Sequence, residues 1–234
     1  MFIAVVNQKG GVGKTTLAVH LAGWHARCGR RVAFFDADGQ ASSSRWMRSA
    51  EPGIEVIEAF DGAAILKQTG ALRKQVDVIV ADGPANLAEV TRALLLVADL
   101  ALIPCGPTLP ELESTAQSVR ILEAARSVRV DRAPAALLVL NRLRDDRFAL
   151  TRDAPAAVAV LGIPPCRSVL RLRETLADAP GQRTLVWRMG YRARTAALEM
   201  TTLMQEIEDY VATTPNHPRH LDHRAGTLPA GQAR

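Results

Sequence analysis

The sequence predicts an α/β domain with a doubly wound, mostly parallel sheet and helices on both faces. Short apolar, β-branched runs alternate along the chain with segments that carry apolar residues at helical spacing. Several of these runs end in glycine-rich or acidic residues, and the carboxyl ends of strands are where open α/β sheets bind ligands. With 234 residues, of which 48% are hydrophobic, the chain is long enough for one domain with a full core.

A glycine-rich turn joins the first predicted strand, residues 1–6, to the first predicted helix, residues 15–27. The turn and the start of the helix consist of Lys9, Gly10, Gly11, Val12, Gly13, Lys14, Thr15 and Thr16. Glycines let backbone N–H groups surround phosphate oxygens, Lys14 can reach the β and γ phosphates, and Thr15 offers a hydroxyl to Mg²⁺. A strict Walker A motif has glycine where this chain has Gln8, so the pattern predicts a phosphate loop that differs by one residue.

Acidic residues follow two further predicted strands. The strand at residues 32–35 leads to Asp36 and Asp38, and the strand at residues 76–80 leads to Asp82. The apolar run that ends in Asp82 has the Walker B pattern, and Mg²⁺ retains several waters when carboxylates bind it. We therefore expect Asp82 to hold Mg²⁺ through water.

The same periodicities predict the remaining helices and strands, and none of these is predicted to carry a catalytic residue. The predicted strands are at residues 54–59, 100–104 and 135–140, with a strand edge at 163–165. The predicted helices are at residues 63–75, 87–97, 111–126 and 150–161. A last helix begins at Arg192 and Arg194 and runs to about residue 211. Trp46 follows a polar stretch and is expected to pack in the core rather than to stack on a base.

The last residues of the chain differ in composition from the rest. Residues 213–234 are rich in proline, glycine and small polar residues and show no periodicity, which predicts a disordered tail. The folded domain is accordingly expected to span residues 1–212.

Residues 7–16, with the letters NQKGGVGKTT, closely resemble the deviant Walker A motif of the ParA/MinD family of P-loop ATPases. The segment from Asp36 to Gln40 resembles the Walker A′ motif of that family, with Gly39 in place of the usual proline, and residues 41–46 look like the small plasmid-partition ParF type. The resemblance implies the P-loop NTPase fold of the deviant Walker A type, with ATP and Mg²⁺ as cofactors.

The resemblance also implies roles for individual residues. Lys9 would reach across a dimer interface to the nucleotide of the partner subunit, and Lys9 and Lys14 would neutralise phosphate charge. Asp38 would orient or activate the attacking water, while Thr15, Asp36 and Asp82 would form the metal site. Asn141, at the end of a strand, would read the adenine edge. Because nothing in the chain spells the Asn-Lys-x-Asp motif of guanine-specific enzymes, ATP is favoured over GTP.

Charge is unevenly distributed along the chain. Residues 142–194 contain eleven arginines and five acids, a net charge of +6 within a chain whose total is +5, and such a bias suggests a polyanionic partner. The family resemblance implies non-specific DNA binding by a C-terminal basic surface in the ATP state. The candidate residues for this surface are Arg167, Arg171, Arg173, Arg192 and Arg194.

The expected function is that of a Mg²⁺-dependent ATPase that forms a homodimer on ATP binding and partitions a plasmid or chromosome. The resemblance implies weak basal hydrolysis that a ParB-like or ParG-like adaptor stimulates, and a cytoplasmic, nucleoid-associated location. Cargo positioning of a protein organelle such as a carboxysome, or assembly of a secretion or cellulose synthesis system, stays open as an alternative.

Two other classes fit the sequence less well. A membrane-surface ATPase of the MinD kind needs a C-terminal amphipathic helix, which residues 215–234 do not provide, and no apolar run reaches the length of a membrane span, so no membrane partner is expected. An electron-transfer reductase needs cluster cysteines, but Cys28, Cys105 and Cys166 are widely separated, which also argues against disulfides.

Overall fold

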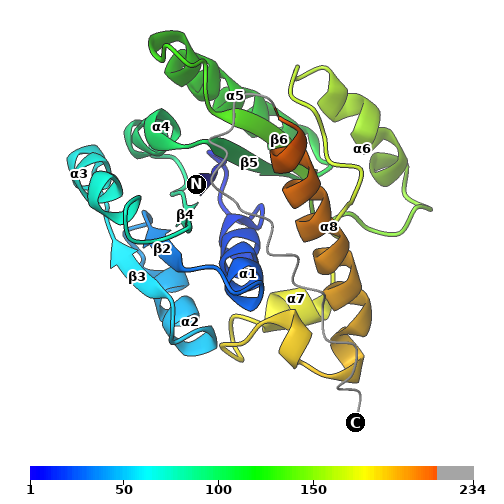
Figure 1. Ribbon diagram of the computed structural model, residues 1–234. Helices are drawn as coiled ribbons and strands as arrows, with labels where there is room; N and C mark the ends of the chain where they lie inside the picture. Colours follow the sequence, from blue (N-terminus) through cyan, green and yellow to red (C-terminus); the bar gives the residue numbers. More distant parts are fainter. Residues whose placement is uncertain (215–234) are drawn as a thin grey trace.

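A six-stranded parallel sheet forms the centre of the molecule, which confirms the predicted fold class. The computed structural model describes residues 1–214, and its strands lie in the order β3-β2-β4-β1-β5-β6 with every neighbouring pair parallel (Figure 1). The strands are β1 (Phe2–Val5), β2 (Val32–Asp36), β3 (Glu55–Glu58), β4 (Val78–Asp82), β5 (Leu100–Cys105) and β6 (Ala135–Leu140). Because β1 lies between β4 and β5, the chain changes direction across the sheet at β1, and such a switch point is where open α/β sheets bind ligands.

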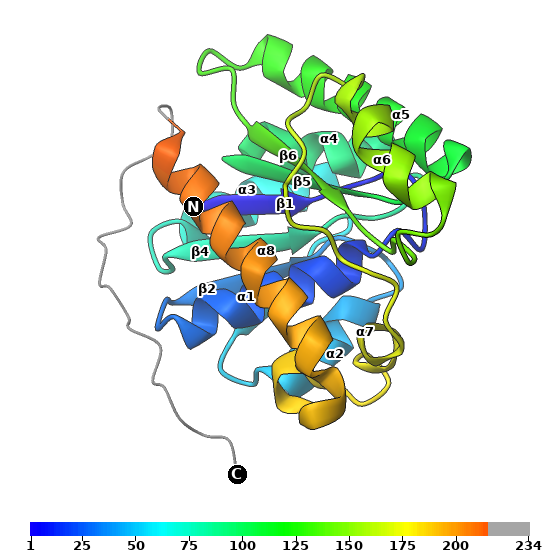
Figure 2. The ribbon, with the colours of Figure 1, turned by 90° about the vertical axis from the view of Figure 1, so that its right-hand side faces the viewer.

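Helices cover both faces of the sheet (Figures 1 and 2). They are α1 (Lys14–Arg27), α2 (Ser42–Ala50), α3 (Gly62–Leu72), α4 (Ala88–Val97), α5 (Leu109–Val128), α6 (Ala149–Ala159), α7 (Glu174–Asp178) and α8 (Arg194–Thr213), with 3-10 turns at Val186–Arg188 and Tyr191–Ala193. Alternate residues of β1 supply the two cores: Ile3 packs with α1, α2 and α8, whereas Phe2 packs with α3, α4 and α5.

Most predicted elements are present within a few residues of the expected bounds, and the differences have local causes. Helix α5 begins at Leu109 rather than at residue 111 because Thr108 and Glu111 form a capping box in front of it. The strand edge expected at residues 163–165 is reduced to one parallel bridge between Leu138 and Pro165.

Helix α2 was not expected from the sequence. Its three consecutive serines are weak helix formers, and its buried face is partly polar because it includes Ser43 and Ser44 beside Trp46 and Met47. Trp46 is buried, donates its indole N–H to the Thr184 carbonyl at 2.9 Å, and meets the ring of His20 edge-on. The expectation that Trp46 packs in the core is therefore confirmed.

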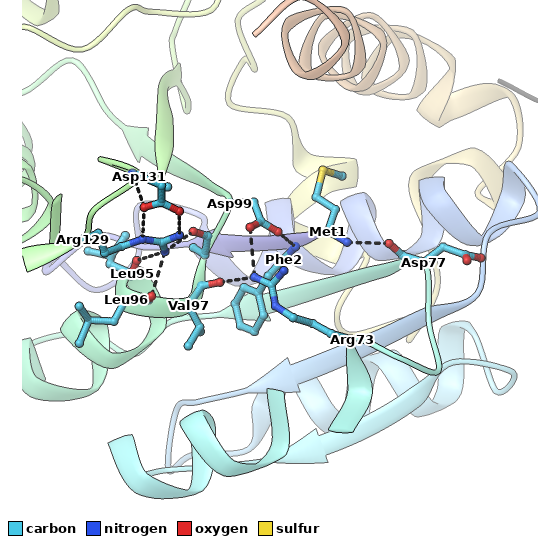
Figure 3. A network of polar contacts seen from close by, with 12 residues as sticks. Met1, Phe2, Arg73, Asp77, Leu95, Leu96, Val97, Asp99, Arg129 and Asp131 are labelled. Atoms are coloured by element: carbon cyan, nitrogen blue, oxygen red, sulfur yellow. Dashed lines mark hydrogen bonds and ion pairs between the residues drawn. The ribbon is translucent and has the colours of Figure 1, made fainter. Parts of the chain in front are cut away.

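The amino-terminal edge of the sheet is held by a polar network (Figure 3). Arg129 donates to the carbonyls of Leu96 and Ala98 at 2.8 and 2.7 Å, so it satisfies the last turn of α4. Asp99 accepts a hydrogen bond from the backbone N–H of Phe2 at 2.6 Å and an ion pair from Arg73 at 3.1 Å. The polar groups of this edge thus find partners within the protein.

Two further expectations concern the cysteines and the chain end. None of the three cysteines forms a disulfide in residues 1–214; Cys28 is exposed and Cys105 and Cys166 are buried. Within residues 1–214 there is no helix long and apolar enough to cross a membrane. Of the tail predicted at 213–234, residues 215–234 lie outside the described residues.

Candidate nucleotide and metal site

The glycine-rich turn lies at the carboxyl end of β1 and leads directly into α1. Gly11 and Gly13 have φ values of 75° and 94°, in the left-handed region that glycine adopts without a steric penalty. The backbone N–H of Leu17 donates to the Gly13 carbonyl at 3.0 Å and closes the first helical turn. The turn therefore presents the N-terminus of a 14-residue helix at the switch point of the sheet, an arrangement suited to phosphate.

Asn7 and Gln8 anchor the start of this loop to the helices behind it. The Asn7 amide donates to the Pro104 carbonyl at 2.8 Å and to the Thr115 hydroxyl at 3.0 Å, and Gln8 donates its amide N–H to Thr91 at 3.2 Å. Both side chains are buried. Gln8, which replaces the glycine of a strict Walker A motif, thus fastens the loop to α4, a role that local sequence does not reveal.

Asn141 ties the end of β6 to the same loop. Its amide nitrogen donates to the Val12 carbonyl at 2.7 Å, and its amide oxygen accepts from the backbone N–H of Arg142 at 2.9 Å. Arg142 in turn donates to the Gly11 carbonyl at 2.8 Å. Asn141 therefore lies beside the phosphate loop with both amide groups bonded to backbone, and its role in reading adenine stays a prediction.

We expect Gly13→Ala to destabilise the protein by about 3 kcal/mol or more, because it combines a left-handed backbone with a steric clash. A Cβ atom at Gly13 would lie 2.1 Å from the Asn141 amide nitrogen. Gly29 is the matched control, since its φ is 76° but a Cβ there meets nothing within 4 Å, and we expect Gly29→Ala to cost about 1–2 kcal/mol. Urea unfolding measures both, and equal costs would contradict the Asn141 contact.

The two lysines of the loop are in different environments. Lys14 is buried and donates its ammonium to the Lys9 carbonyl at 2.9 Å. Burial lowers the pKa of Lys14, while the nearby carboxylates of Asp82 and Asp38 raise it. Lys9 is half-buried, and its ammonium makes no hydrogen bond or ion pair with any residue in the range 1–214.

The predicted metal residues meet at the ends of β2 and β4. Asp36 and Asp82 are register partners on these adjacent strands, and the Thr15 hydroxyl donates to one oxygen of Asp82 at 2.7 Å. Burial raises the pKa of Asp82 to about 7, the Thr15 hydroxyl opposes that shift, Asp36 adds to it, and Lys14 and the Ser43 hydroxyl oppose it.

The donor set of this corner suits Mg²⁺. It consists of carboxylate and hydroxyl oxygens, which are the ligands of a hard divalent cation. The second carboxylate oxygen of Asp82 is buried and has no hydrogen-bond partner in the described chain. A buried carboxylate oxygen without a hydrogen-bond partner can accept a hydrogen bond from a metal-bound water. The residues present therefore fit Mg²⁺.

Asp36 and Asp38 are only two residues apart but differ in position. Asp36 is fully buried and accepts from the backbone N–H groups of Asp38 at 3.1 Å and Ser44 at 2.8 Å, so it shapes the loop. Asp38 is half-buried, and its carboxylate accepts a hydrogen bond only from the backbone N–H of Gln40 among the described residues, at 3.1 Å. The arrangement leaves the Asp38 carboxylate largely available for a reactant.

The five candidate DNA-binding arginines do not form one equivalent set. Three of them are ion-paired: Arg171 with Asp146 at 3.0 Å, Arg173 with Glu199 at 2.5 Å and Arg192 with Asp178 at 2.9 Å. Arg167 and Arg194 have exposed side chains and form no ion pair with an acid among residues 1–214, although the backbone N–H of Arg167 donates to Glu206 at 2.6 Å. Three of the five candidate guanidinium groups are therefore held by carboxylates of the fold.

A cavity of about 550 Å³ lies along the chain just after Arg142, the residue that contacts the loop. Its lining is mixed, with charged side chains from two segments and one aromatic ring. The lining residues are Leu143, Arg144, Asp145, Asp146, Phe148, Arg171, Leu172 and Arg173. The guanidinium of Arg144 lies 5.7 Å from the centre of the Phe148 ring.

Comparison with known proteins places this site in a family context. A family model described as the CobQ/CobB/MinD/ParA nucleotide binding domain matches residues 3–186. The chain is 29% identical over 210 residues to maintenance of carboxysome distribution protein A of Halothiobacillus neapolitanus, covering 88% of this chain and 95% of that protein. It is 30% identical over 209 residues to the chromosome-partitioning ATPase Soj of Thermus thermophilus, covering 76% and 84% of the two chains.

A solved structure supports the same fold. The structure of apo McdA from Cyanothece superposes with a TM-score of 0.72, covering 88% of this chain and 98% of that chain at 16% sequence identity. At that level of identity the likeness shows the fold alone.

Proposed function

The chain belongs to the CobQ/CobB/MinD/ParA nucleotide-binding family, and on that premise we propose that it is a Mg²⁺-dependent ATPase that dimerises on ATP and positions a cargo along DNA. One observation carries the proposal: Lys14, Thr15 and the two carboxylates Asp36 and Asp82 converge at the carboxyl ends of three adjacent strands. Nucleotide binding measured with ATP and with ADP, followed by phosphate release, tests it directly.

The site supports phosphoryl transfer to water by positioning and charge stabilisation. The loop N–H groups and the Lys14 ammonium would hold the β and γ phosphates, and Lys14 exchanges its contact with the Lys9 carbonyl for phosphate oxygens. Thr15, Asp36 and Asp82 would hold Mg²⁺, which when bound neutralises phosphate charge. Asp38 would orient the attacking water, since it is half-buried whereas Asp36 and Asp82 are buried.

The cavity beside Arg142 is the proposed space for the nucleotide base. Arg142 donates to the Gly11 carbonyl, so the lining that begins at Leu143 continues directly from the phosphate loop. In this proposal Asn141 stands between the phosphate and base ends of the site. Competition of GTP against a bound ATP analogue measures the base preference, and ATP is expected to bind more tightly.

The working unit is proposed to be a homodimer that contains two nucleotides. Lys9 supports this proposal because its ammonium has no partner in residues 1–214 although its backbone is held by Asn7 at 3.0 Å. A cation on a fixed backbone, beside a phosphate site, is suited to a phosphate from a second chain. An adaptor of the ParB or ParG kind would stimulate a weak basal hydrolysis.

We propose that the ATP-bound dimer binds DNA without sequence specificity. The protein would then be cytoplasmic and associated with the nucleoid. The cargo is proposed to be a plasmid or chromosome, in line with the similarity to Soj. A protein cargo is the second candidate, because the similarity to the carboxysome distribution protein extends over 95% of that relative. Binding to non-specific DNA with ATP, but not with ADP, is expected in both cases, and its absence favours an assembly role.

We expect reversal of the unpaired charges, Arg167→Glu with Arg194→Glu, to weaken ATP-dependent DNA binding by roughly tenfold or more while DNA-free hydrolysis is kept. Both side chains are exposed, and each lost phosphate contact lowers the salt dependence of the binding constant by about one in log–log slope. The control reverses two exposed arginines elsewhere, Arg120 on α5 and Arg132. Fluorescence anisotropy across a salt series measures both, and equal DNA affinities would remove Arg167 and Arg194 from the surface.

A further inference from the structure

Buried polar atoms without partners gather at one corner of the molecule. Across residues 1–214, four buried side-chain nitrogen or oxygen atoms lack a hydrogen-bond partner: His25 Nε2, Ser43 Oγ, Ser44 Oγ and one oxygen of Asp82. Such atoms are rare in proteins, because a buried polar group without a hydrogen bond is destabilising. Two of the four, Ser43 Oγ and the Asp82 oxygen, lie where the first turn of α2 meets the predicted metal residues, which points to a polar ligand at that corner.

Helix α2 brings Ser43 to this corner. The chain leaves the Asp36 loop through Ala41, whose φ is 49°, and the backbone N–H of Ser44 donates to Asp36 at 2.8 Å. Since Asp36 is the register partner of Asp82, the first turn of α2 lies beside both carboxylates. Ser43 is fully buried, and its hydroxyl lies among the groups around Asp82 without a hydrogen bond to any residue in the range 1–214.

The Ser44 side chain is as buried as that of Ser43 but points toward a different neighbour. Its hydroxyl faces Glu58 on β3, where it adds to the effect of Arg48 in lowering the pKa of that carboxyl. The two serines are therefore a matched pair on one helix turn, both fully buried and both without a hydrogen-bond partner, and only Ser43 faces the predicted metal residues.

We propose that Ser43 is a positioning residue of the Mg²⁺ site, with its hydroxyl donating to the free oxygen of Asp82 and accepting from a water of the bound ion. A serine hydroxyl has one donor and two acceptor lone pairs, so it can do both at once. Mg²⁺ retains several waters in proteins, and each water needs acceptors for its hydrogens. The inference rests on the proposed function, because the ion arrives with the nucleotide.

The direction of the stability change separates this role from a structural one. In the protein without ligand the Ser43 hydroxyl makes no hydrogen bond with residues 1–214, so Ser43→Ala breaks none. The variant is accordingly expected to melt close to the wild-type temperature. A residue that only supported the fold would instead lower the melting temperature when truncated.

The test measures the dissociation constant of ADP in excess Mg²⁺ and in EDTA, with no hydrolysis involved. Mg²⁺ is expected to tighten ADP binding to the wild type. In Ser43→Ala the ratio of the ADP dissociation constants in EDTA and in Mg²⁺ should fall by about tenfold, while the affinity in EDTA is unchanged. The control Ser44→Ala should keep the full Mg²⁺ effect.

Each other outcome overturns the proposal. An unchanged Mg²⁺ effect in Ser43→Ala, an equal loss in Ser44→Ala, or a lowered melting temperature of Ser43→Ala removes Ser43 from the metal site and leaves the proposed ATPase function standing. A wild-type protein that binds no ADP, or binds it equally with and without Mg²⁺, overturns the proposed function together with the role of Ser43.

Discussion

Lys14→Ala is expected to weaken ATP binding by at least about 100-fold, equivalent to roughly 3 kcal/mol. Lys14 is buried at the N-terminus of α1, and its ammonium is a charged donor on the phosphate loop, where it bonds to the Lys9 carbonyl. Removing it also leaves the carboxylates of Asp82 and Asp38 without the cation that now lies near them, so their charges would repel the incoming phosphates. Equilibrium binding of a fluorescent ATP analogue measures the loss.

Lys67→Ala is the matched control for this experiment. Lys67 is an exposed residue of α3, so its replacement changes the net charge equally without touching the loop. We expect the control to bind ATP as the wild type does. Normal ATP affinity in the Lys14 variant would contradict the assignment of residues 9–16 as the phosphate loop.

Asp38→Ala is expected to retain ATP binding and to slow hydrolysis by about 100-fold or more, the usual contribution of a residue that positions or activates water. Asp38 is half-buried, and within residues 1–214 its carboxylate accepts a hydrogen bond only from the backbone N–H of Gln40, so replacing the side chain leaves the loop anchors of Asp36 in place. Because ATP is then held without turnover, the dimer should accumulate. Phosphate release and size-exclusion chromatography with ATP measure the two effects.

An exposed aspartate on α6, Asp153, provides the control for the Asp38 variant. Asp153→Ala is expected to hydrolyse ATP at the wild-type rate and to show no dimer accumulation. If the Asp38 variant hydrolyses ATP as fast as the control, the water-orienting role is wrong. If it fails to bind ATP, Asp38 belongs to the binding site instead.

The phosphate loop could be predicted from residues that are neighbours in the sequence. Glycines between a β-branched run and a helical run predict the turn at residues 9–16 from neighbouring residues alone, and the structure contains that turn. The position of Asp82 was equally predictable because an apolar run ending in an acid places the carboxylate at a strand end. The function of Gln8 was not, since its partner Thr91 lies 83 residues further along the chain.

The charge that the arginine-rich segment leaves unpaired could not be predicted from local sequence. Composition predicted a basic surface from residues 142–194, but the pairs Arg171–Asp146 and Arg173–Glu199 join residues 25 and 26 positions apart. Whether a charge is free depends on which acid the fold brings within about 4 Å of it, and no local pattern contains that information. Tertiary structure thus reduced five candidate arginines to two with unpaired charge.

By itself, the sequence determined the fold class, the phosphate loop and the acidic strand ends, because each depends on residues that are neighbours along the chain. Only the tertiary structure decided the strand order and the contact of Asn141 with the loop. It also placed the first turn of the unpredicted helix α2 beside Asp36 and Asp82. The physical reason is that a parallel sheet brings the ends of distant strands to one edge, and there the chemistry of the site is set by side chains that meet in space.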